Sequence, residues 1–318
     1  MLGRVANTIY WMNRYLERAE NYARFMDVNF NLSLELSPNE EQQWKPLVVI
    51  TGDWPLYESL HEKAEKNKVI NFMAFESENP NSICNCIINA RENARAIRPE
   101  ITKEVWEQIN ALYYLVKRAS EKKRLNDSEV RHFFSDIKNG CQLLYGIYDA
   151  TISRNEGWNF AKLGQLIERA DKTSRVLDVK YHLLLGSANQ VGSSLDLIQW
   201  TALLKSVSAY DMYRKKYGKL SSTSIAEFLI LDTDFPRSIL NCLIRAEQSI
   251  VRLCGSSFGY CNNAQRQLGA LKAQLEFTDI NDIIAEGLHE YLDNIQGKLN
   301  DISTAIYEAF FSIEPHVN

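Results

Sequence analysis

The stretch YLERAENYARFMDV, residues 15–28, recurs in altered form as LIERADKTSRVLDV, residues 166–179. Both copies read Glu-Arg-Ala and a second acid, then Arg four residues after that acid, then Asp-Val. In an α-helix, steps of three, four and seven residues return to one face. The Glu, the second acid, the later Arg and the Asp therefore share one face of each predicted helix. The repetition predicts a chain built from two related helical units.

The rest of the chain carries the same helical period. Apolar residues recur at intervals of three and four along nearly its whole length, and no segment alternates convincingly as a strand would. Seven prolines and fourteen glycines are few for 318 residues, which favours long uninterrupted helices. These patterns predict an all-α helical bundle.

Two further pairs of segments repeat. FMAFESENPNSICNCIINA, residues 72–90, aligns without a gap with FLILDTDFPRSILNCLIRA, residues 228–246. SEVRHFFSDIKNG, residues 128–140, resembles AEGLHEYLDNIQG, residues 285–297. Chance likeness between amphipathic helices is the alternative interpretation, and the matched proline and serine positions weigh against it.

These repeats divide the chain near its middle. We predict a first helical repeat over residues 1–155 and a second over residues 156–318, packed as one compact unit about a pseudo-twofold axis. The one notable linker, GSANQVGSS at residues 186–194, is too short to separate independent domains.

Charge and hydropathy limit the partners of the protein. A net charge of −4 and a pI near 5.8 give no electrostatic footprint for nucleic acid. The first residues carry charge throughout and do not resemble a signal peptide, and no apolar run is long enough to cross a membrane. We therefore expect a cytoplasmic protein that binds neither nucleic acid nor membrane.

The cysteines fit the same location. No two of them form a Cys-x-x-Cys pair, and most stand among apolar helical residues. Reduced thiols in a helical core are therefore expected, as in cytoplasmic proteins. The six positions are 84, 86, 141, 242, 254 and 261.

The repeated charged face has two interpretations. It is either a solvated surface with weak ion pairs or an interface or cleft wall between the two halves. Because the charged identities persist in both copies while many flanking residues differ, we favour the interface or cleft. We then expect the two helices to meet, with Glu17 reaching Arg175 and Glu168 reaching Arg24.

Other arginines extend the candidate binding surface. Arg18 and Arg169 point about 100° away from the charged face and extend a cationic edge. Arg91 and Arg95 begin a one-sided row on another helix, suited to carboxylate or phosphate unless it is a solvated surface. Arg237 precedes a predicted N-cap serine, where free backbone amides attract anions. The candidate binding residues are Glu17, Arg18, Arg24, Glu168, Arg169, Arg175, Arg91, Arg95 and Arg237.

A metal site is an alternative hypothesis. Glu129 with His132, and Glu286 with His289, form two Glu-x-x-His pairs at repeat-equivalent positions. Di-iron bundles use two such pairs together with one Glu from each of two other helices, which Glu17 and Glu168 would supply. Neighbouring arginines compete for those carboxylates, so this hypothesis ranks below anion binding.

No motif of a known reaction occurs in the chain. It has no glycine-rich phosphate loop, no nucleophile elbow and no Ser-His-Asp arrangement. We therefore expect no catalytic cofactor.

Several long segments, in order, resemble the bacterial alpha-E family, which is named for a helical Glu-Arg motif. Glu17-Arg18 and Glu168-Arg169 match that motif, and Arg237 lies in the family's Phe-Pro-Arg-Ser segment. The sequence departs from the family at Asn13-Arg14 and Gly164-Gln165, where Gly-Arg is expected, which puts symmetric use of that position in doubt. The quoted segments are YWMNRYLERAENYARFMDV, INARENARAIRPEITKEVWEQIN, EGWNFAKLGQLIERADKTSRVLDVKY, SAYDMYRKKYG and FLILDTDFPRSI.

What the resemblance implies about function is modest. Members are mostly of unknown function and are commonly encoded beside, or fused to, a circularly permuted ATP-grasp protein, often with a transglutaminase-like protease. This association implies a non-catalytic helical partner of a peptide or amide ligase, which binds the ligase, a peptide or an anionic group through its Glu-Arg face. The alternative is an enzyme, either the di-metal bundle or a ligase component with Glu17 and Glu168 as general bases.

Overall fold

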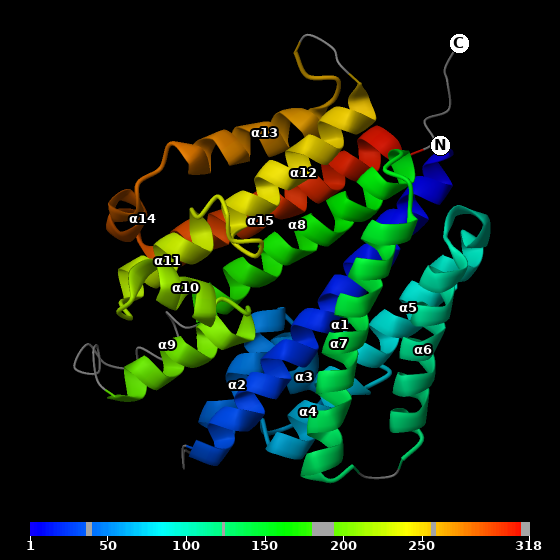
Figure 1. Ribbon diagram of the computed structural model, residues 1–318. Coiled ribbons are helices and arrows are strands. Elements are labelled where there is room, and N and C mark those ends of the chain that lie inside the picture. The colour runs from blue at the N-terminus through cyan, green and yellow to red at the C-terminus, as the bar shows by residue number, and fades with distance from the viewer. Residues whose placement is uncertain (36–39, 123–124, 180–193, 256–258, 313–318) are drawn as a thin grey trace.

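The computed structural model describes residues 1–35, 40–122, 125–179, 194–255 and 259–312 (Figure 1). All regular structure in these ranges is helical, which confirms the all-α prediction. The helices are α1 (Gly3–Glu35), α2 (Glu40–Thr51), α3 (Trp54–Leu60), α4 (Lys66–Ala74), α5 (Ile83–Ala96), the 3-10 turn η1 (Arg98–Glu100), α6 (Lys103–Ser120), α7 (Asp127–Thr151), α8 (Glu156–Val179), α9 (Ser194–Ser206), α10 (Tyr210–Tyr217), α11 (Ser222–Ile230), α12 (Ile239–Cys254), α13 (Asn263–Glu276), α14 (Ile280–Glu286) and α15 (Leu288–Phe310).

Side-chain caps start several of these helices. The hydroxyls of Ser82 and Ser238 accept hydrogen bonds from the backbone N–H of the third residue of α5 and of α12. Thr102 caps α6 in the same way, and Asn126 forms a capping box with Glu129 at the start of α7. Each cap satisfies a backbone donor that the first helical turn leaves without a partner.

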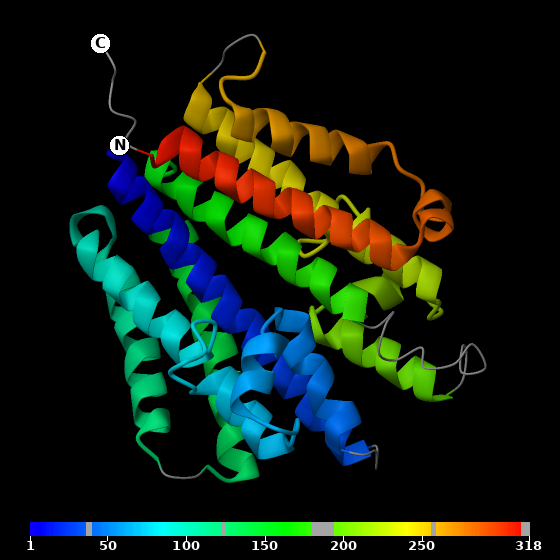
Figure 2. The ribbon, with the colours of Figure 1, turned by 180° about the vertical axis from the view of Figure 1, so that it is seen from behind.

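Helices α1 and α8 form the centre of the molecule and pack against each other (Figures 1 and 2). On one side α5 and α7 pack against α1, and α6 packs against both of them. On the other side α12 and α15 pack against α8, and α13 packs against both of them. The two central helices are thus covered on most faces, so that polar residues on them become buried.

The shorter helices connect the two sides. Helix α2 packs against α8, and α9 packs against α1. Local contacts recur along the chain: the Tyr57 hydroxyl donates to the Lys63 carbonyl at 2.8 Å, and the Tyr213 hydroxyl donates to the Lys219 carbonyl at 2.8 Å. Both tyrosines are fully buried beneath these turns.

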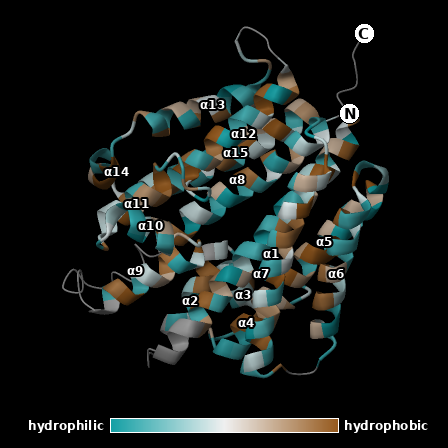
Figure 3. Cartoon of the chain, viewed as in Figure 1, coloured by the Kyte–Doolittle hydropathy of each residue, from teal (hydrophilic) through white to brown (hydrophobic). Residues whose placement is uncertain are grey.

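An apolar cluster of the described residues runs through the interior from α1 to α15. Figure 3 shows hydrophobic and hydrophilic residues interspersed along the helices, as expected of amphipathic helices, in which apolar residues recur every three or four positions. Among the described residues, no helix has the length and apolar character needed to cross a membrane.

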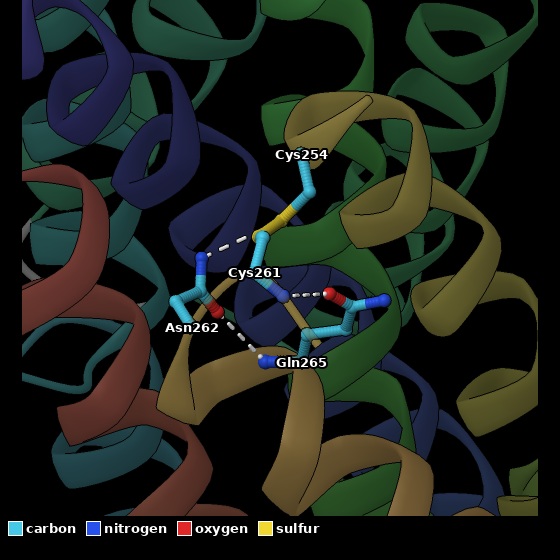
Figure 4. Close-up of a disulfide and its surroundings, with 4 residues drawn as sticks. All are labelled: Cys254, Cys261, Asn262 and Gln265. Carbon is cyan, nitrogen blue, oxygen red and sulfur yellow. Dashed lines mark hydrogen bonds between the residues drawn. A yellow bond between two sulfur atoms is a disulfide. The ribbon is translucent and has the colours of Figure 1, made fainter. Parts of the chain in front are cut away.

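The expectation of six reduced cysteines is wrong for one pair. Cys254, at the end of α12, and Cys261, just before α13, form a disulfide (Figure 4). They flank the connection between two adjacent helices, and their Cα atoms lie 5.9 Å apart, within the range that a disulfide spans. The other four cysteines, at positions 84, 86, 141 and 242, are buried thiols as expected.

Candidate functional site

The two Glu-Arg motifs meet where α1 and α8 pack together. Arg169 of α8 donates from Nε and Nη2 to the two carboxylate oxygens of Glu17, both at 2.8 Å. Arg18 of α1 donates from Nε and Nη2 to Glu168, at 2.7 Å and 3.0 Å. The glutamate of each motif therefore forms a salt bridge with the arginine of the other motif. The expected meeting of the two helices is confirmed.

Both glutamates are fully buried and charged. Burial by itself would raise the pKa of Glu17, but Arg169 and Arg237 hold it well below its usual range. Burial opposes ionisation of Glu168 too, and Arg18 with Lys172 holds its pKa well below its usual range. Each carboxylate is thus a permanent counter-ion at neutral pH.

Additional donors complete the shell around Glu17. Arg237, which precedes α12, donates to Glu17 Oε1 at 3.2 Å and to both oxygens of Glu20 at 2.8 and 2.9 Å. Asn21 donates to Glu17 Oε1 at 3.1 Å, and Gln165 donates to Oε2 at 3.3 Å. The Glu17 carboxylate therefore receives hydrogen bonds from α1, from α8 and from the residue before the N-cap of α12.

The shell around Glu168 has a similar geometry but a different composition. Arg14 donates to Glu168 Oε2 at 2.8 Å, and the Lys172 ammonium lies 3.5 Å from Oε1. Asn81, near the start of α5, accepts from Arg18 Nη1 at 2.5 Å. Arg14 contacts Glu168 in the same way that Gln165 contacts Glu17, so that equivalent places in the two shells hold an arginine and a glutamine.

The predicted partners of Arg24 and Arg175 are wrong. Arg24 binds Glu20 at 2.6 Å rather than Glu168, and Arg175 binds Asp171 at 3.0 Å rather than Glu17. Residues four apart on one helix lie directly above each other, so these pairs form within α1 and within α8. The ion pairs between the two helices are formed instead by Arg18 and Arg169, the arginines that directly follow the two glutamates.

The outer ends of Arg24 and Arg175 reach tight turns on the far side of the centre. Arg24 Nη1 donates to the Ser208 hydroxyl between α9 and α10. Arg175 Nη1 lies 3.3 Å from the position a Cβ would take on Gly52, between α2 and α3. Both turn residues have positive φ, 54° at Ser208 and 80° at Gly52. Each arginine therefore lies next to a turn whose backbone conformation few non-glycine residues adopt.

The charges in this region do not balance. We call the residues of the two ionic networks, around Glu17 and around Glu168, the ER array. Within it seven cations face four carboxylates, so that three positive charges are in excess. Two remain if Asp53 is counted, because Asn81 connects it to Arg18. The array comprises Arg14, Glu17, Arg18, Glu20, Asn21, Arg24, Gln165, Glu168, Arg169, Asp171, Lys172, Arg175 and Arg237.

The arginine row on α5 lies outside the ER array. Arg91 donates to Asn110 at 2.8 Å and lies over the ring of Tyr113, with its Cζ atom 4.2 Å from the ring centroid. Arg95 pairs with Glu92 at 2.5 Å, and its side chain is 69% exposed. These contacts connect α5 to α6 and neutralise much of the row.

The two Glu-x-x-His pairs are not brought together as metal ligands. Glu129 serves the α7 capping box and pairs with Lys122 at 2.8 Å, and His132 Nδ1 lies 2.7 Å from the Ser128 carbonyl. His289 Nδ1 lies 2.7 Å from Asp178, and Glu286 ends α14. No three His, Cys, Asp or Glu residues in the described ranges are grouped to hold a metal ion.

Several members of the array were not selected from the sequence. Lys172 and Asn21 stand four residues after Glu168 and Glu17, so their helical spacing was available as a signal. Arg14 and Gln165 are likewise one turn before the facing arginines. Glu20 and Asp171 were recognised as part of the charged face, but their role in holding Arg237, Arg24 and Arg175 depends on the tertiary structure.

The sequence matches the model of a protein family over nearly its whole length. A family model described as Alpha-E, a predicted alpha-helical domain with a conserved ER motif, matches residues 1–311. Uncharacterized proteins of Mycobacterium bovis and Mycobacterium tuberculosis are 21% identical over 327 aligned positions, which cover 95% of this chain. The chain spans only 36% of the length of these relatives. No solved structure matches it.

Proposed function

Because the chain belongs to the Alpha-E family, we propose that it is a non-catalytic helical partner of an ATP-grasp-type peptide or amide ligase. In this role the ER array binds an anionic group of the ligase or of its peptide substrate. The observation that carries the proposal is the excess of buried positive charge around α1 and α8. Burying a cation without a counter-ion costs free energy of desolvation, and an anion supplied by a ligand would offset that cost.

The state of the two motif glutamates supports binding over catalysis. A general base works best when its pKa lies near the operating pH, whereas Arg169 and Arg18 hold the pKa values of Glu17 and Glu168 below their usual range. Both carboxylates are also fully enclosed by their partners. They are therefore poorly suited to accept a proton, and their role is to position the arginines.

The length of the relatives supports a partner role. The mycobacterial proteins devote about a third of their length to the part that matches this chain, and the remainder is available for other domains. A helical unit that forms one part of a longer protein is expected to act together with another component. We place this system in the cytoplasm, where ATP is available to a ligase.

We also propose that the chain is a duplicated unit with a pseudo-twofold axis, consisting of residues 1–155 and 156–318. The reciprocal exchange between Glu17-Arg18 and Glu168-Arg169 supports this, because a twofold axis makes each contact occur in both directions. The positive-φ turn at Gly52 recurs at Ser208, the position that the sequence alignment pairs with it. Duplication would place two related but differently charged sites on opposite sides of the centre.

Co-purification from the organism that encodes the chain tests the partner role. The tagged chain is expected to retain the ATP-grasp protein encoded beside it, identified by mass spectrometry. Arg175→Ala is expected to reduce that retention, because it removes a cation of the array whose side chain is 23% exposed. Arg95→Ala, on the α5 surface, is the matched control and is expected to retain the ligase.

Two outcomes would contradict this proposal. Recovery of the wild-type chain alone, with the ATP-grasp protein present and unbound in the same extract, would remove the partnership. Equal retention by wild type and by a folded Arg175→Ala variant would remove the ER array from the contact and leave it a structural element. Far-ultraviolet circular dichroism establishes that each variant is folded.

A further inference from the structure

The guanidinium of Arg175 lies beside the turn between α2 and α3, and the chain uses only part of it. Its Nε donates to both carboxylate oxygens of Asp171, each at 3.0 Å. Among the described residues, no hydrogen bond uses its Nη1 or Nη2. An arginine carries five N–H donors, so the four on Nη1 and Nη2 remain for another partner.

Gly52 leaves an open place next to this guanidinium. A Cβ on Gly52 would lie 3.3 Å from Arg175 Nη1. Apart from the immediate neighbours of Gly52 in the chain, no other atom of the described residues comes within 4 Å of that position. Gly52 itself is exposed. An oxygen atom from solution can therefore approach Nη1 at this turn.

The other copy of the motif shows what occupies the equivalent place. Arg24 corresponds to Arg175 in the repeated motif, and Ser208 aligns with Gly52. There the Ser208 hydroxyl accepts a hydrogen bond from Arg24 Nη1. Gly52 has no hydroxyl, so Arg175 lacks the oxygen partner that Arg24 has.

The open place is connected to the buried charges around Glu168. Contacts of 2.5 to 3.5 Å lead from the guanidinium to the residue that follows Gly52. They connect, in order, Arg175, Asp171, Lys172, Glu168, Arg18, Asn81 and Asp53. The Tyr22 hydroxyl donates to Asp53 at 3.1 Å, and the Lys172 ammonium lies 5.9 Å from the Tyr22 ring centroid. A charge bound at Arg175 therefore acts on the whole network.

The charge of this network indicates the class of ligand. Four cations face three carboxylates, so that one positive charge is in excess. A carboxylate supplies one negative charge, whereas a phosphoryl group carries about −1.5 to −2 near pH 7 and would overcompensate. The two oxygens of a carboxylate also match two N–H groups of one guanidinium. The cations are Arg14, Arg18, Lys172 and Arg175, and the carboxylates are Asp53, Glu168 and Asp171.

We infer that Arg175, through Nη1 and Nη2 beside the open turn at Gly52, binds a carboxylate group of a ligand. One carboxylate oxygen takes the place beside Arg175 that the Ser208 hydroxyl takes beside Arg24. The inference deepens the proposed function, because it names the anionic group, and it rests on that function only for a peptide as the biological source. The C-terminus of a peptide and a small free acid offer the same chemistry.

Three small ligands test the inference and separate the two sources. Isothermal titration calorimetry at about pH 7.5 measures the affinity of acetyl-trialanine with a free C-terminal carboxylate, of the same peptide with a C-terminal amide, and of acetate. Wild type is expected to bind the acid at least about tenfold more tightly than the amide, because the amide brings no charge to the excess cation. Acetate that binds as tightly as the peptide acid would support the site and identify a small free acid as its source.

Gly52→Ser supplies the hydroxyl that Ser208 supplies in the other copy. It is expected to weaken binding of the peptide acid at least about tenfold, because the new side chain occupies the open place beside Arg175. The matched control is Gly218→Ser. Gly218 also has a positive φ, of 73°, and no atom of the described residues lies within 4 Å of the place of its Cβ. The control therefore adds similar backbone strain without an arginine, and it is expected to bind like wild type.

Arg175→Lys keeps the positive charge and removes the paired N–H groups, so it is expected to weaken binding of the peptide acid as well. It decides the result if Gly52→Ser does not fold. Equal affinity of wild type for the peptide acid and its amide, together with no binding of acetate, would overturn the inference. Unchanged affinity for the acid in the folded variants would do the same, and so would tighter binding of inorganic phosphate than of either carboxylate.

The result is separable from the test of the proposed function. Binding of the peptide acid without retention of an ATP-grasp protein would leave the site intact and remove the ligase from its role. Retention of the ligase by a chain that binds no carboxylate would keep the partnership and overturn this site.

Discussion

Arg169 on α8 binds the carboxylate of Glu17 on α1 through two parallel hydrogen bonds, both of 2.8 Å. The Glu17 side chain is completely buried, so water does not reach this pair. Bidentate pairing of this kind is the strongest geometry available to a guanidinium and a carboxylate. It joins the two central helices at the middle of the bundle, and Arg18 with Glu168 repeats it.

Glu17→Gln is expected to be strongly destabilising. The amide keeps the shape of the side chain but leaves Arg169 and Arg237 buried without their shared counter-charge, at a cost of about 3–5 kcal/mol in the free energy of unfolding. Urea unfolding followed by circular dichroism measures this. Glu92→Gln, which loses surface pairs with Arg91 and Arg95, is the control and is expected to cost under about 1 kcal/mol.

A double-mutant cycle separates the observed pair from the partner predicted from sequence. Glu17 and Arg169 are expected to show a coupling free energy of about 1–3 kcal/mol, because they touch. Glu17 and Arg175 are expected to couple more weakly, since Arg175 binds Asp171. Coupling of Glu17 that is larger to Arg175 than to Arg169 would contradict the arrangement of the array.

The buried carboxylates are expected to make the protein sensitive to acid. The pKa values of Glu17, Glu168 and Asp171 are all lower in the folded state than their ordinary values, despite burial, because adjacent arginines and Lys172 favour ionisation. Their contribution to stability is therefore complete above the unfolded pKa, about 4. It is lost as the pH falls below that value toward the folded pKa values.

Urea unfolding between pH 3 and pH 7 measures this dependence. Wild-type stability is expected to stay level above about pH 5.5 and to fall steeply below about pH 4. Glu168→Gln is expected to be less stable at neutral pH and to lose less stability in acid. An equally steep decline in that variant would mean that other groups control acid unfolding.

The contact between His289 and Asp178 is expected to act in the opposite direction. The hydrogen bond to Asp178 raises the pKa of His289 above its ordinary value, although burial opposes this slightly. The stabilisation is therefore fully present below the unfolded pKa, about 6.5, and is lost as the pH rises through the folded pKa. The difference in melting temperature between wild type and His289→Asn is expected to be larger at pH 6 than at pH 9.

Asp178→Asn provides the comparison for His289. It keeps the histidine and removes the negative charge that favours its protonation. The difference in melting temperature between wild type and Asp178→Asn is therefore also expected to be larger at pH 6 than at pH 9. A wild-type advantage over both variants that is equal at the two pH values would show that the contact stabilises α8 and α15 without a contribution from protonation.

The disulfide between Cys254 and Cys261 is expected to stabilise the α12–α13 connection. Closing a loop of this length contributes about 2–3 kcal/mol by restricting the unfolded chain. A reducing agent is expected to lower the melting temperature of wild type and to leave that of Cys254→Ser unchanged. Thiol titration of the denatured protein is expected to find four thiols before reduction and six after it. Six thiols without reduction would exclude the bridge.

Helical period and charge placement were readable from local sequence. The spacing of apolar residues predicts an all-α protein because the period of a helix is set by its own backbone geometry. The repeated Glu-Arg-Ala motif also indicated that its two helices meet, since a charged face repeated with few changes favours an interface over a solvated surface. These properties depend on residues within a few turns of each other.

The partners of each charge were decided by the tertiary structure. Where α1 crosses α8, Glu17 pairs with Arg169, whereas Arg24 and Arg175 pair with carboxylates on their own helices. A helical wheel places these side chains within one broad sector but contains no information on how two helices cross. The disulfide likewise depends on the packing of α12 against α13, which brings Cys254 and Cys261 together.

The complete set of donors around each motif glutamate could not be predicted from sequence for the same reason. The donors around Glu17 come from α1, from α8 and from Arg237, which lies before α12. The sequence by itself determined that this protein is helical, which residues share each helical face and which motif recurs. Only the packing of α1 against α8, with Arg237 beside them, decided which donors surround Glu17 and Glu168, because contacts between distant helices depend on the whole bundle rather than on any one segment.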